Sequence, residues 1–375
     1  AKWAWRWKNT IDRRFMRKFK KLPSQVMSNI SAPDDSRKQP QPHCGGCGAK
    51  VSPDVLSNVL SILAELYPQH CIISQDDSRE IAFPNKAVWQ SIDALREIVS
   101  DPWQMGCLAA NHALSDLYAC GLKPHSVQAL ITIPFASSSI QARELIQILD
   151  GALTVFRRSD CILAGGHSMQ GAELQIAFAV NGHSTASPPN LFSKQGLCDG
   201  DRLVVTRPLG SGVLFAAHMQ LLANGLDLEK ALSIMIENNY HAAKSCLEHG
   251  VRWATDVTGF GLAVHMLEML QPSQGAIINI GDLPSFDGAL SCLAKGVRST
   301  SHETNREFAS GSLIGLDGAG IEAELLFDPQ TCGGMLVGVA PKKLKKLSTA
   351  LCSEGVGSYV IGEVTSRQGF IDLCY

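Results

Sequence analysis

The spacing of apolar residues changes between two periods along the first half of the chain. Alternating or continuous apolar residues predict strands, and apolar residues three and four positions apart predict helices. The predicted strands cover residues 87–93, 126–133 and 173–182. The predicted helices cover residues 53–66, 103–120 and 138–157. A stretch rich in Ser and Pro, residues 184–200, then interrupts the pattern. It predicts that a first α/β domain covers residues 44–183.

The second half shows the same mixture of periods. Its predicted helices cover residues 210–224, 227–249, 260–271 and 341–353. Its predicted strands cover residues 202–206, 276–280, 324–338 and a final pair within 358–374. The pattern therefore predicts a second α/β domain over residues 200–375, in a two-domain chain of the α/β (α+β) class.

The N-terminal segment has a different pattern. Large apolar residues recur every four positions through residues 1–21, and Lys and Arg fill many of the positions between them, which predicts a basic amphipathic helix. Such a helix lies on an anionic membrane surface, docks on a partner or packs on its own protein. Residues 22–43 lack apolar periodicity and are rich in Pro, Ser and charge, as a linker is.

Composition supports an enzyme rather than a nucleic-acid-binding protein. The 375 residues are 45% hydrophobic and include 33 glycines, enough for two cores and many tight turns. The formal net charge is −2, and because basic residues concentrate in residues 1–21, the remainder is acidic. A general nucleic-acid surface needs Lys and Arg spread over a face, so this distribution excludes one.

The cysteines and the hydropathy pattern indicate a cytoplasmic protein. Ten of the 12 cysteines stand singly in apolar patterns and are expected to be buried free thiols in a reducing compartment. They are Cys71, Cys107, Cys120, Cys161, Cys198, Cys246, Cys292, Cys332, Cys352 and Cys374. No apolar run reaches the length of a membrane span, and no signal segment opens the chain.

The other two cysteines lie in HCGGCGAK, residues 43–50. Cys44 and Cys47 have the spacing of half a zinc site, although no second pair follows at a suitable distance, and of a thiol–disulfide motif. The third interpretation is a mobile glycine loop, in which the Lys50 ammonium lowers the pKa of the Cys47 thiol and attracts an anion.

Acidic residues near predicted strand ends suggest a nucleotide site. They are Asp76, Asp77, Asp93, Asp116 and Asp256. A polyphosphate sits among carboxylates only when cations intervene, and Mg²⁺ prefers carboxylate and phosphate oxygens, so the cluster suggests an ATP site with several Mg²⁺ ions. Taken singly, each Asp is also typical of a helix cap or a surface acid. The GxxxxGK[ST] phosphate loop and the protein-kinase signatures are absent from the sequence.

Three glycine pairs have alternative interpretations. The stretch Gly165-Gly166-His167-Ser168 follows an apolar run and offers N–H groups and a hydroxyl to an anion, or forms a plain strand-to-loop turn. The pairs at residues 210–212 and 259–261 lack the third glycine of a dinucleotide fingerprint and are expected in turns or at helix starts.

A series of motifs, in order, closely resembles the selenophosphate synthetase (selenide, water dikinase) family. The motifs are GCGAK at 46–50, Asp76-Asp77, ALSD at 113–116 with GLKP at 121–124, LAGGHS at 163–168, TRPLG at 206–210, TDVTGFG at 255–261 and DPQTCGG at 328–334. Together they cover about residues 43–375. Varied forms of DVTGFG and DPQT-x-GG also occur in the wider superfamily of aminoimidazole ribonucleotide synthetase and thiamine-monophosphate kinase. The Cys-Gly-x-Lys loop distinguishes selenophosphate synthetase from these sister enzymes.

The resemblance implies a fold, a reaction and a set of site residues. It implies an N-terminal mixed sheet or half-barrel used for dimerisation and a C-terminal α/β domain. The implied reaction converts ATP, selenide and water to selenophosphate, AMP and phosphate, in a homodimer whose two subunits share each ATP site. Cys47 resembles the catalytic thiol, and Lys50 the cation near the transferred phosphoryl group. The implied Mg²⁺ ligands are Asp77, Asp116 and Asp256. The implied ATP contacts are Lys50, Ser74, Gln75, Asp76, Asp93 and Asp116, with Gly166, His167 and Ser168 reaching ATP from the partner chain.

Some positions depart from the family pattern. Ala49 stands where many members have a second cysteine, His112 where Asn is frequent, Gln170 where Asp is frequent, and His302-Glu303 where two glycines are common. The basic N-terminus resembles the tail of NADH-dehydrogenase-like flavoproteins that some members carry fused ahead of the synthetase, which implies a bifunctional enzyme. The selenium donor is free selenide or a delivering protein.

Two rival functions remain at this point. A sister ATP-dependent kinase or synthetase accounts for the aspartates and glycines but leaves Cys47 and Lys50 without a role. A non-catalytic selenium or thiol carrier accounts for Cys47 but not for five placed aspartates.

Overall fold

The computed structural model describes residues 79–83, 86–186, 189–367 and 369–375. The predicted helix at 53–66, the amphipathic helix at 1–21 and the linker at 22–43 lie outside these residues and stay predictions.

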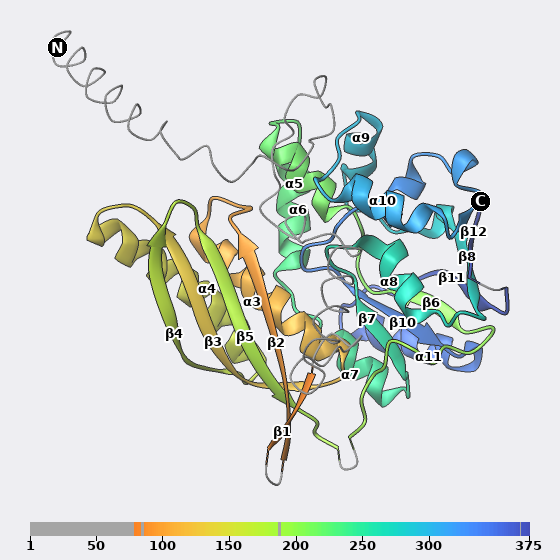
Figure 1. The fold of residues 1–375 in the computed structure, drawn as a ribbon, viewed down its shortest axis with the longest axis horizontal. Helices are drawn as coiled ribbons and strands as arrows, with labels where there is room; N and C mark the ends of the chain where they lie inside the picture. The colour runs from red at the N-terminus through yellow and green to blue at the C-terminus, as the bar shows by residue number, and fades with distance from the viewer. Residues whose placement is uncertain (1–78, 84–85, 187–188, 368) are drawn as a thin grey trace, which may run out of the picture. The chain divides into compact units, whose positions relative to one another are not determined.

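The N-terminal half of the described chain forms a five-stranded sheet in the order β1-β2-β5-β3-β4. The strands are β1 (Arg79–Phe83), β2 (Lys86–Arg96), β3 (Lys123–Pro134), β4 (Ile162–Gly171) and β5 (Gln175–His183). Only the β3–β4 pair in this sheet is parallel. One face of the sheet is covered by α3 (Pro102–Ala119) and α4 (Ser138–Arg158), as Figure 1 shows.

Residues at the start of helix α3 cap it, and a glycine near its middle lets it pack closely on α4. Asp101 accepts a hydrogen bond from the Gln104 N–H at 2.8 Å, and a proline occupies the first helical position. Farther along, Gly106 and Gly151 let α3 and α4 pack backbone to backbone. A Cβ at Gly106 would lie 2.0 Å from the carbonyl oxygen of Ile148, so only glycine fits there.

The sheet has one covered face and one open face. Period-two alternation along β5 buries Ile176, Phe178 and Val180 against the helices. The opposite face carries Ile92 on β2, which is 66% exposed, and Leu130 on β3, which is 41% exposed. Large apolar side chains therefore stand on a sheet face that no described element covers.

The C-terminal half forms a mixed seven-stranded sheet in the order β7-β10-β6-β11-β8-β12-β9. Its strands are β6 (Arg202–Val205), β7 (Trp253–Asp256), β8 (Gly275–Asn279), β9 (Leu313–Ile314), β10 (Met335–Val339), β11 (Tyr359–Thr365) and β12 (Ile371–Cys374). Its α-helices are α5 (Ser211–Met219), α6 (Gly225–Met235), α7 (Tyr240–Glu248), α8 (Gly261–Met269), α9 (Ala289–Ala294), α10 (His302–Ser310) and α11 (Pro341–Ser353). Short 3₁₀ turns are η2 (Ile280–Asp282), η3 (Leu316–Gly318) and η4 (Glu322–Leu326). Helix α3 of the first half contacts β7 and α7 of the second.

The structure confirms most of the predicted long elements and corrects three. The predicted helix at 227–249 is two helices, α6 and α7, separated by residues 236–239. The predicted strand at 324–338 is a strand only from Met335, because residues 322–326 form the 3₁₀ turn η4 and residues 327–334 form a buried loop. The elements β7, α9 and α10 were not predicted. Strand β7 and helix α9, of four and six residues, are too short to show a period.

The third correction concerns Gly165-Gly166-His167-Ser168, which lies within strand β4 and not in a turn. The alternation is hidden because both glycines lack side chains and most of this edge strand is exposed. The pairing with β3 shifts register between Val127 and Gln128, and Gly165 takes a φ of 144°, as at a β-bulge.

The prediction of buried free thiols is confirmed for six cysteines: Cys107, Cys120, Cys161, Cys246, Cys292 and Cys332. It is wrong for Cys198, Cys352 and Cys374, which are exposed, and Cys71 lies outside the described residues. Burial raises the pKa of Cys107 to about 12, which suppresses its thiolate form. Within the described residues, no helix has both the length and the apolarity to cross a membrane.

Candidate active site

Two predicted site residues, Asp93 and Asp116, lie where β2 packs on α3. The Ser91 hydroxyl on β2 donates a hydrogen bond to Oδ2 of Asp116 on α3. One residue pair farther along, Nε2 of His112 lies 3.6 Å from Oδ2 of Asp93. The strand period of two places Ser91 and Asp93 on one face, and the helical spacing of four places His112 and Asp116 on the facing side.

This cluster adds two residues to those expected from the sequence. Ser91 was missed, although it stands two positions before Asp93 on a predicted strand and so had to share its face. His112 was noted only as a departure from the family pattern. Its side chain is 1% exposed and contacts the Asp93 carboxylate, so it helps to orient that carboxylate.

Asp256 lies at the C-terminal end of β7, opposite Met335 of β10. The residue is 2% exposed, and its Oδ2 has no hydrogen-bond partner among the described residues. A buried carboxylate oxygen without a partner is costly, and a hard cation is a suitable partner for it. The described residues contain no group of three His, Cys, Asp or Glu placed to hold a metal ion, and the third expected ligand, Asp77, lies outside them.

The turn after Asp256 is held by a chain of polar contacts. Nε2 of His265 accepts the backbone N–H of Thr258 at 3.2 Å, and Nδ1 of His265 lies 3.2 Å from Oε2 of Glu268. The same Glu268 oxygen accepts a hydrogen bond from Nζ of Lys194 at 3.2 Å. Burial opposes ionisation of Glu268, but His265 and Lys194 outweigh it and lower its pKa to about 2. These contacts fix the backbone that carries Asp256.

The DPQTCGG segment binds the first turn of α5. Oε1 of Gln330 accepts the N–H groups of Gly210 at 3.1 Å and Ser211 at 3.2 Å, and Oδ2 of Asp328 accepts the Gly212 N–H at 3.0 Å. Burial raises the pKa of Asp328 to about 6. The free N–H groups of this helix start are therefore used inside the protein, and the expectation that Gly210 and Gly261 stand at helix starts is confirmed.

Gln330→Ala is expected to lower the free energy of unfolding by about 2 to 4 kcal/mol, because it leaves buried N–H groups of α5 without acceptors. Urea unfolding followed by circular dichroism measures the change. The matched control is Gln147→Ala on the exposed side of α4, which should change stability by less than about 0.5 kcal/mol. Equal stabilities for the two variants would show that the Gln330 contacts contribute nothing.

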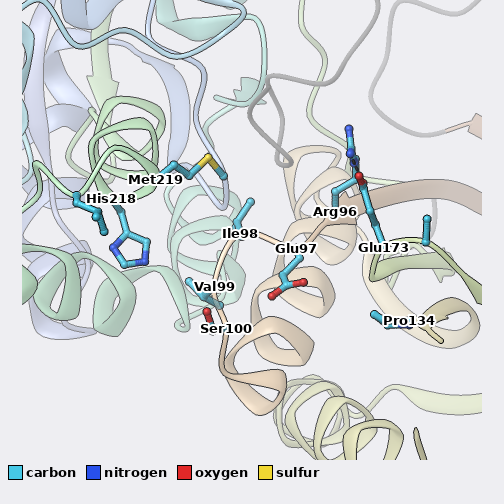
Figure 2. A pocket seen from close by; sticks show the side chains of 11 residues that line it. Arg96, Glu97, Ile98, Val99, Ser100, Pro134, Glu173, His218 and Met219 are labelled. Carbon is cyan, nitrogen blue, oxygen red and sulfur yellow. Dashed lines mark hydrogen bonds and ion pairs between the residues drawn. The ribbon is translucent and has the colours of Figure 1, made fainter. Parts of the chain in front are cut away.

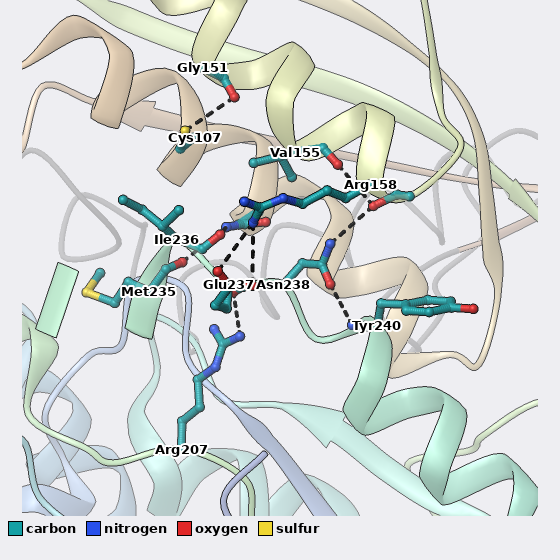
Figure 3. Close-up of polar contacts among 12 residues, drawn as sticks. Cys107, Gly151, Val155, Arg158, Arg207, Met235, Ile236, Glu237, Asn238 and Tyr240 are labelled. Carbon is teal, nitrogen blue, oxygen red and sulfur yellow. Dashed lines mark hydrogen bonds and ion pairs between the residues drawn. The ribbon is translucent and has the colours of Figure 1, made fainter. Parts of the chain in front are cut away.

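A polar junction joins the two halves near the segment between α6 and α7 (Figure 3). Nδ2 of Asn111 on α3 donates to the Met235 carbonyl at 3.1 Å. Arg207 donates to the carbonyls of Glu237 at 2.5 Å and Cys332 at 2.8 Å, and burial lowers its pKa. The Glu237 carboxylate accepts from Arg158 at the end of α4 at 3.3 Å. Residues 235–239 thus contact both halves of the chain.

The remaining predicted site residues divide into two groups. Gly166, His167 and Ser168 lie on the exposed edge strand β4, where a Cβ at Gly166 would come within 2.2 Å of the Ala129 carbonyl oxygen of β3. The second group lies outside the described residues: Cys47, Lys50, Ser74, Gln75, Asp76 and Asp77.

A groove of about 530 Å³ lies elsewhere, between the ends of β2 and β3 and the end of α5 (Figure 2). Arg96 and Glu173, which form an ion pair, line it together with His218 and Met219. None of the predicted site residues that the structure describes lines it.

Comparison with known protein families matches both halves of the chain. Residues 74–184 match the N-terminal domain of AIR synthase related proteins, and residues 199–373 match the C-terminal domain of the same proteins. The first match includes Asp93, Asp116 and Gly166, and the second includes Asp256.

Full-length relatives decide the family within this superfamily. The selenide, water dikinase of Carboxydothermus hydrogenoformans is 32% identical over 336 residues, which are 88% of this chain and 96% of that protein. The chain belongs to the selenide, water dikinase family. The selenide, water dikinase of Shewanella sp. (strain MR-7) is 31% identical over 358 residues, 93% of this chain and 100% of the relative.

Solved structures with the same fold superpose on most of this chain. Thiamine-monophosphate kinase from Stenotrophomonas maltophilia superposes with a TM-score of 0.59 at 16% identity, covering 87% of this chain and 96% of the kinase. Escherichia coli HypE, a hydrogenase maturation protein, superposes with a TM-score of 0.56 at 17% identity, covering 86% of this chain and 93% of HypE. At these identities the likeness concerns the fold alone. The two-domain α/β fold expected from the sequence is confirmed.

Proposed function

We propose that the protein makes selenophosphate from selenide, ATP and water and releases AMP and phosphate. The observation that carries the proposal is the match to selenide, water dikinases along 96% to 100% of their length, in a chain that has both Cys47 and Lys50. A sister enzyme of the same fold would need neither side chain. A selenium carrier would need no buried carboxylate such as Asp256, whose Oδ2 has no hydrogen-bond partner among the residues that the structure describes.

Asp77, Asp116 and Asp256 would hold Mg²⁺, which supplies positive charge to the phosphate oxygens. The described part of this set fits a hard cation, because Asp256 presents a buried oxygen that has no hydrogen-bond partner within the described part of the chain. Ser91 donates a hydrogen bond to one oxygen of Asp116, which directs that carboxylate, and Nε2 of His112 lies 3.6 Å from the Asp93 carboxylate. Ser74, Gln75, Asp76, Asp93 and Asp116 would contact ATP.

Cys47 and Lys50 would act on the transferred group from their glycine loop. The Lys50 ammonium would stabilise charge that develops on the phosphoryl oxygens. The same charge favours the thiolate of Cys47, a soft nucleophile suited to selenium.

The protein would act as a homodimer through the open face of the N-terminal sheet. That face carries Ile92 and Leu130 without a described covering element, and Gly166, His167 and Ser168 lie on the edge strand of the same sheet. In a second copy packed there, this segment would reach the neighbouring ATP site.

Leu130→Glu is therefore expected to convert the dimer to a monomer, because it places a charge in the apolar contact. Light scattering measures the mass. The control is Leu226→Glu at the start of α6, a 66% exposed apolar position away from this sheet. A wild-type monomer with full activity would refute the shared site.

Phosphorus NMR tests the function itself. With Mg²⁺, ATP and selenide under reducing conditions, the protein should yield selenophosphate, AMP and phosphate. ATP turnover that does not need selenide would favour a sister enzyme, and selenide binding without turnover would favour a carrier.

Residues 44–183 would form the ATP-binding and dimerisation domain and residues 200–375 the second domain, after a linker at 22–43. The basic helix at 1–21 would be the tail of a preceding flavoprotein domain or a peripheral membrane contact of a cytoplasmic enzyme. Selenide would come free in solution or from a delivery protein.

A further inference from the structure

Asn239 lies at a place where the two halves of the proposed metal site meet. Asn239 is only 4% exposed. Its Nδ2 donates hydrogen bonds to Oγ of Ser115 and to the carbonyl of Gly333, each at 3.0 Å. Ser115 precedes Asp116 on α3. The Gly333 carbonyl belongs to the loop that leads into β10, the strand that pairs with Asp256.

Backbone contacts join the Gly333 loop to the residue after Asp256. The carbonyl of Gly334 accepts the N–H of Val257, the residue after Asp256, at 2.9 Å. A Cβ at Gly333 would lie 1.9 Å from the Val257 carbonyl oxygen, so the two backbones are in close contact. The Asn239 amide therefore contacts Ser115, the residue before Asp116, on one side. On the other side it contacts Gly333, whose neighbour Gly334 is hydrogen-bonded to the residue after Asp256.

The position of Asn239 in its own helix supports a role outside that helix. It is the N-cap residue of α7, where an Asn side chain ordinarily accepts an N–H of the first turn. Here the Asn239 side chain makes no capping hydrogen bond. Its neighbour Asn238 instead accepts the Tyr240 N–H at 3.1 Å, as Figure 3 shows. The Asn239 amide is directed to α3 and the Gly333 loop.

We propose that Asn239 is a positioning residue that sets the separation of Asp116 and Asp256, and so the affinity of the site for a divalent cation with nucleotide. The inference rests on the proposed function, because it takes these two carboxylates as ligands of one metal site. Hydrogen bonds that orient ligands commonly change metal affinity about 10-fold to 100-fold when they are removed.

The fold should survive the loss of this amide. Asn111 still joins α3 to the Met235 carbonyl at 3.1 Å, and Sγ of Cys332 still donates to the Leu108 carbonyl of α3 at 3.2 Å. Asn239→Ala therefore tests whether the amide sets the separation of the Asp116 and Asp256 carboxylates, and not whether it holds the two domains together.

The chain offers a matched control in the adjacent residue. Nδ2 of Asn238 donates to Oγ of Ser159 at 3.2 Å, so Asn238→Ala also removes a contact between the halves, but one beside α4. The probe is Mn²⁺, whose binding in the presence of a non-hydrolysable ATP analogue is followed by electron paramagnetic resonance. Asn239→Ala should raise the dissociation constant about 10-fold or more, whereas Asn238→Ala should change it less than about twofold.

A second variant and a coupling measurement keep the test decisive. Ser115→Ala should weaken Mn²⁺ binding in the same direction, and the Ser115→Ala/Asn239→Ala pair should lose less than the product of the two single effects, because both remove one contact. If circular dichroism shows that Asn239→Ala is unfolded, Ser115→Ala alone carries the test. If Asn239→Ala is folded, equal Mn²⁺ affinities for Asn239→Ala and Asn238→Ala overturn the inference. If Asn239→Ala is unfolded, equal Mn²⁺ affinities for Ser115→Ala and wild type overturn it. Failure of the wild type to bind Mn²⁺, or full binding by Asp256→Asn, would instead overturn the proposed metal site.

Discussion

Cys47→Ser is expected to abolish selenophosphate formation while ATP binding with Mg²⁺ stays within about twofold of the wild type. A serine hydroxyl has too high a pKa to act as the soft thiolate that handles selenium, and the proposed metal ligands are elsewhere in the chain. Lys50→Gln should lower the rate about 100-fold or more, because it removes the charge that stabilises the transferred phosphoryl group. Phosphorus NMR of the products, with separate measurement of nucleotide binding, gives both quantities.

Cys44→Ser is the control for Cys47→Ser. The family resemblance places the required thiol at Cys47, so Cys44→Ser should retain most of the activity under reducing conditions. Equal loss of activity in both cysteine variants would favour the redox-pair or zinc interpretation of residues 43–50 and contradict the proposed mechanism.

Asp256→Asn is expected to weaken binding of Mg²⁺ with nucleotide about 100-fold or more, because it replaces a charged oxygen ligand with a neutral amide. Without metal, the same variant should be at least as stable as the wild type, since the wild-type carboxylate is buried and one of its oxygens has no hydrogen-bond partner in the described ranges. Calorimetric titration and thermal unfolding measure the two effects.

Asp328→Asn is the matched control for Asp256→Asn. Asp328 is also fully buried in the C-terminal half and also has a carboxylate oxygen without a hydrogen-bond partner among the described residues, but its other oxygen holds the first turn of α5. Its replacement should change stability and leave metal affinity nearly unaltered. Equal metal affinities in Asp256→Asn and wild type would remove Asp256 from the site.

The sequence by itself determined the fold class and the long elements. Regular periods of apolar residues identified α3, α4, β3 and β5. When one face of a helix or strand is buried, apolar residues must recur along the sequence with the period of that element. The motifs from residues 46 to 334 also identified the family, since they occur in the same order as in its members.

Only the tertiary structure decided which polar groups meet. Ser91 contacts Asp116 across 25 residues, and Asn239 contacts Ser115 across 124. Gln330 holds Gly210 across 120 residues. Such contacts depend on the register between packed elements, and the period of a single strand or helix shows which face a side chain occupies but not what lies opposite.

The strand β4 shows the same limit on a local scale. Its Gly165-Gly166 pair has the composition of a turn, and its exposed edge position removes the alternation that would mark a strand. Pairing with β3 makes it a strand, because the backbone hydrogen bonds come from residues 126–134 rather than from its own neighbours. Local sequence determined where apolar faces lie, and packing between distant segments determined the geometry of the site.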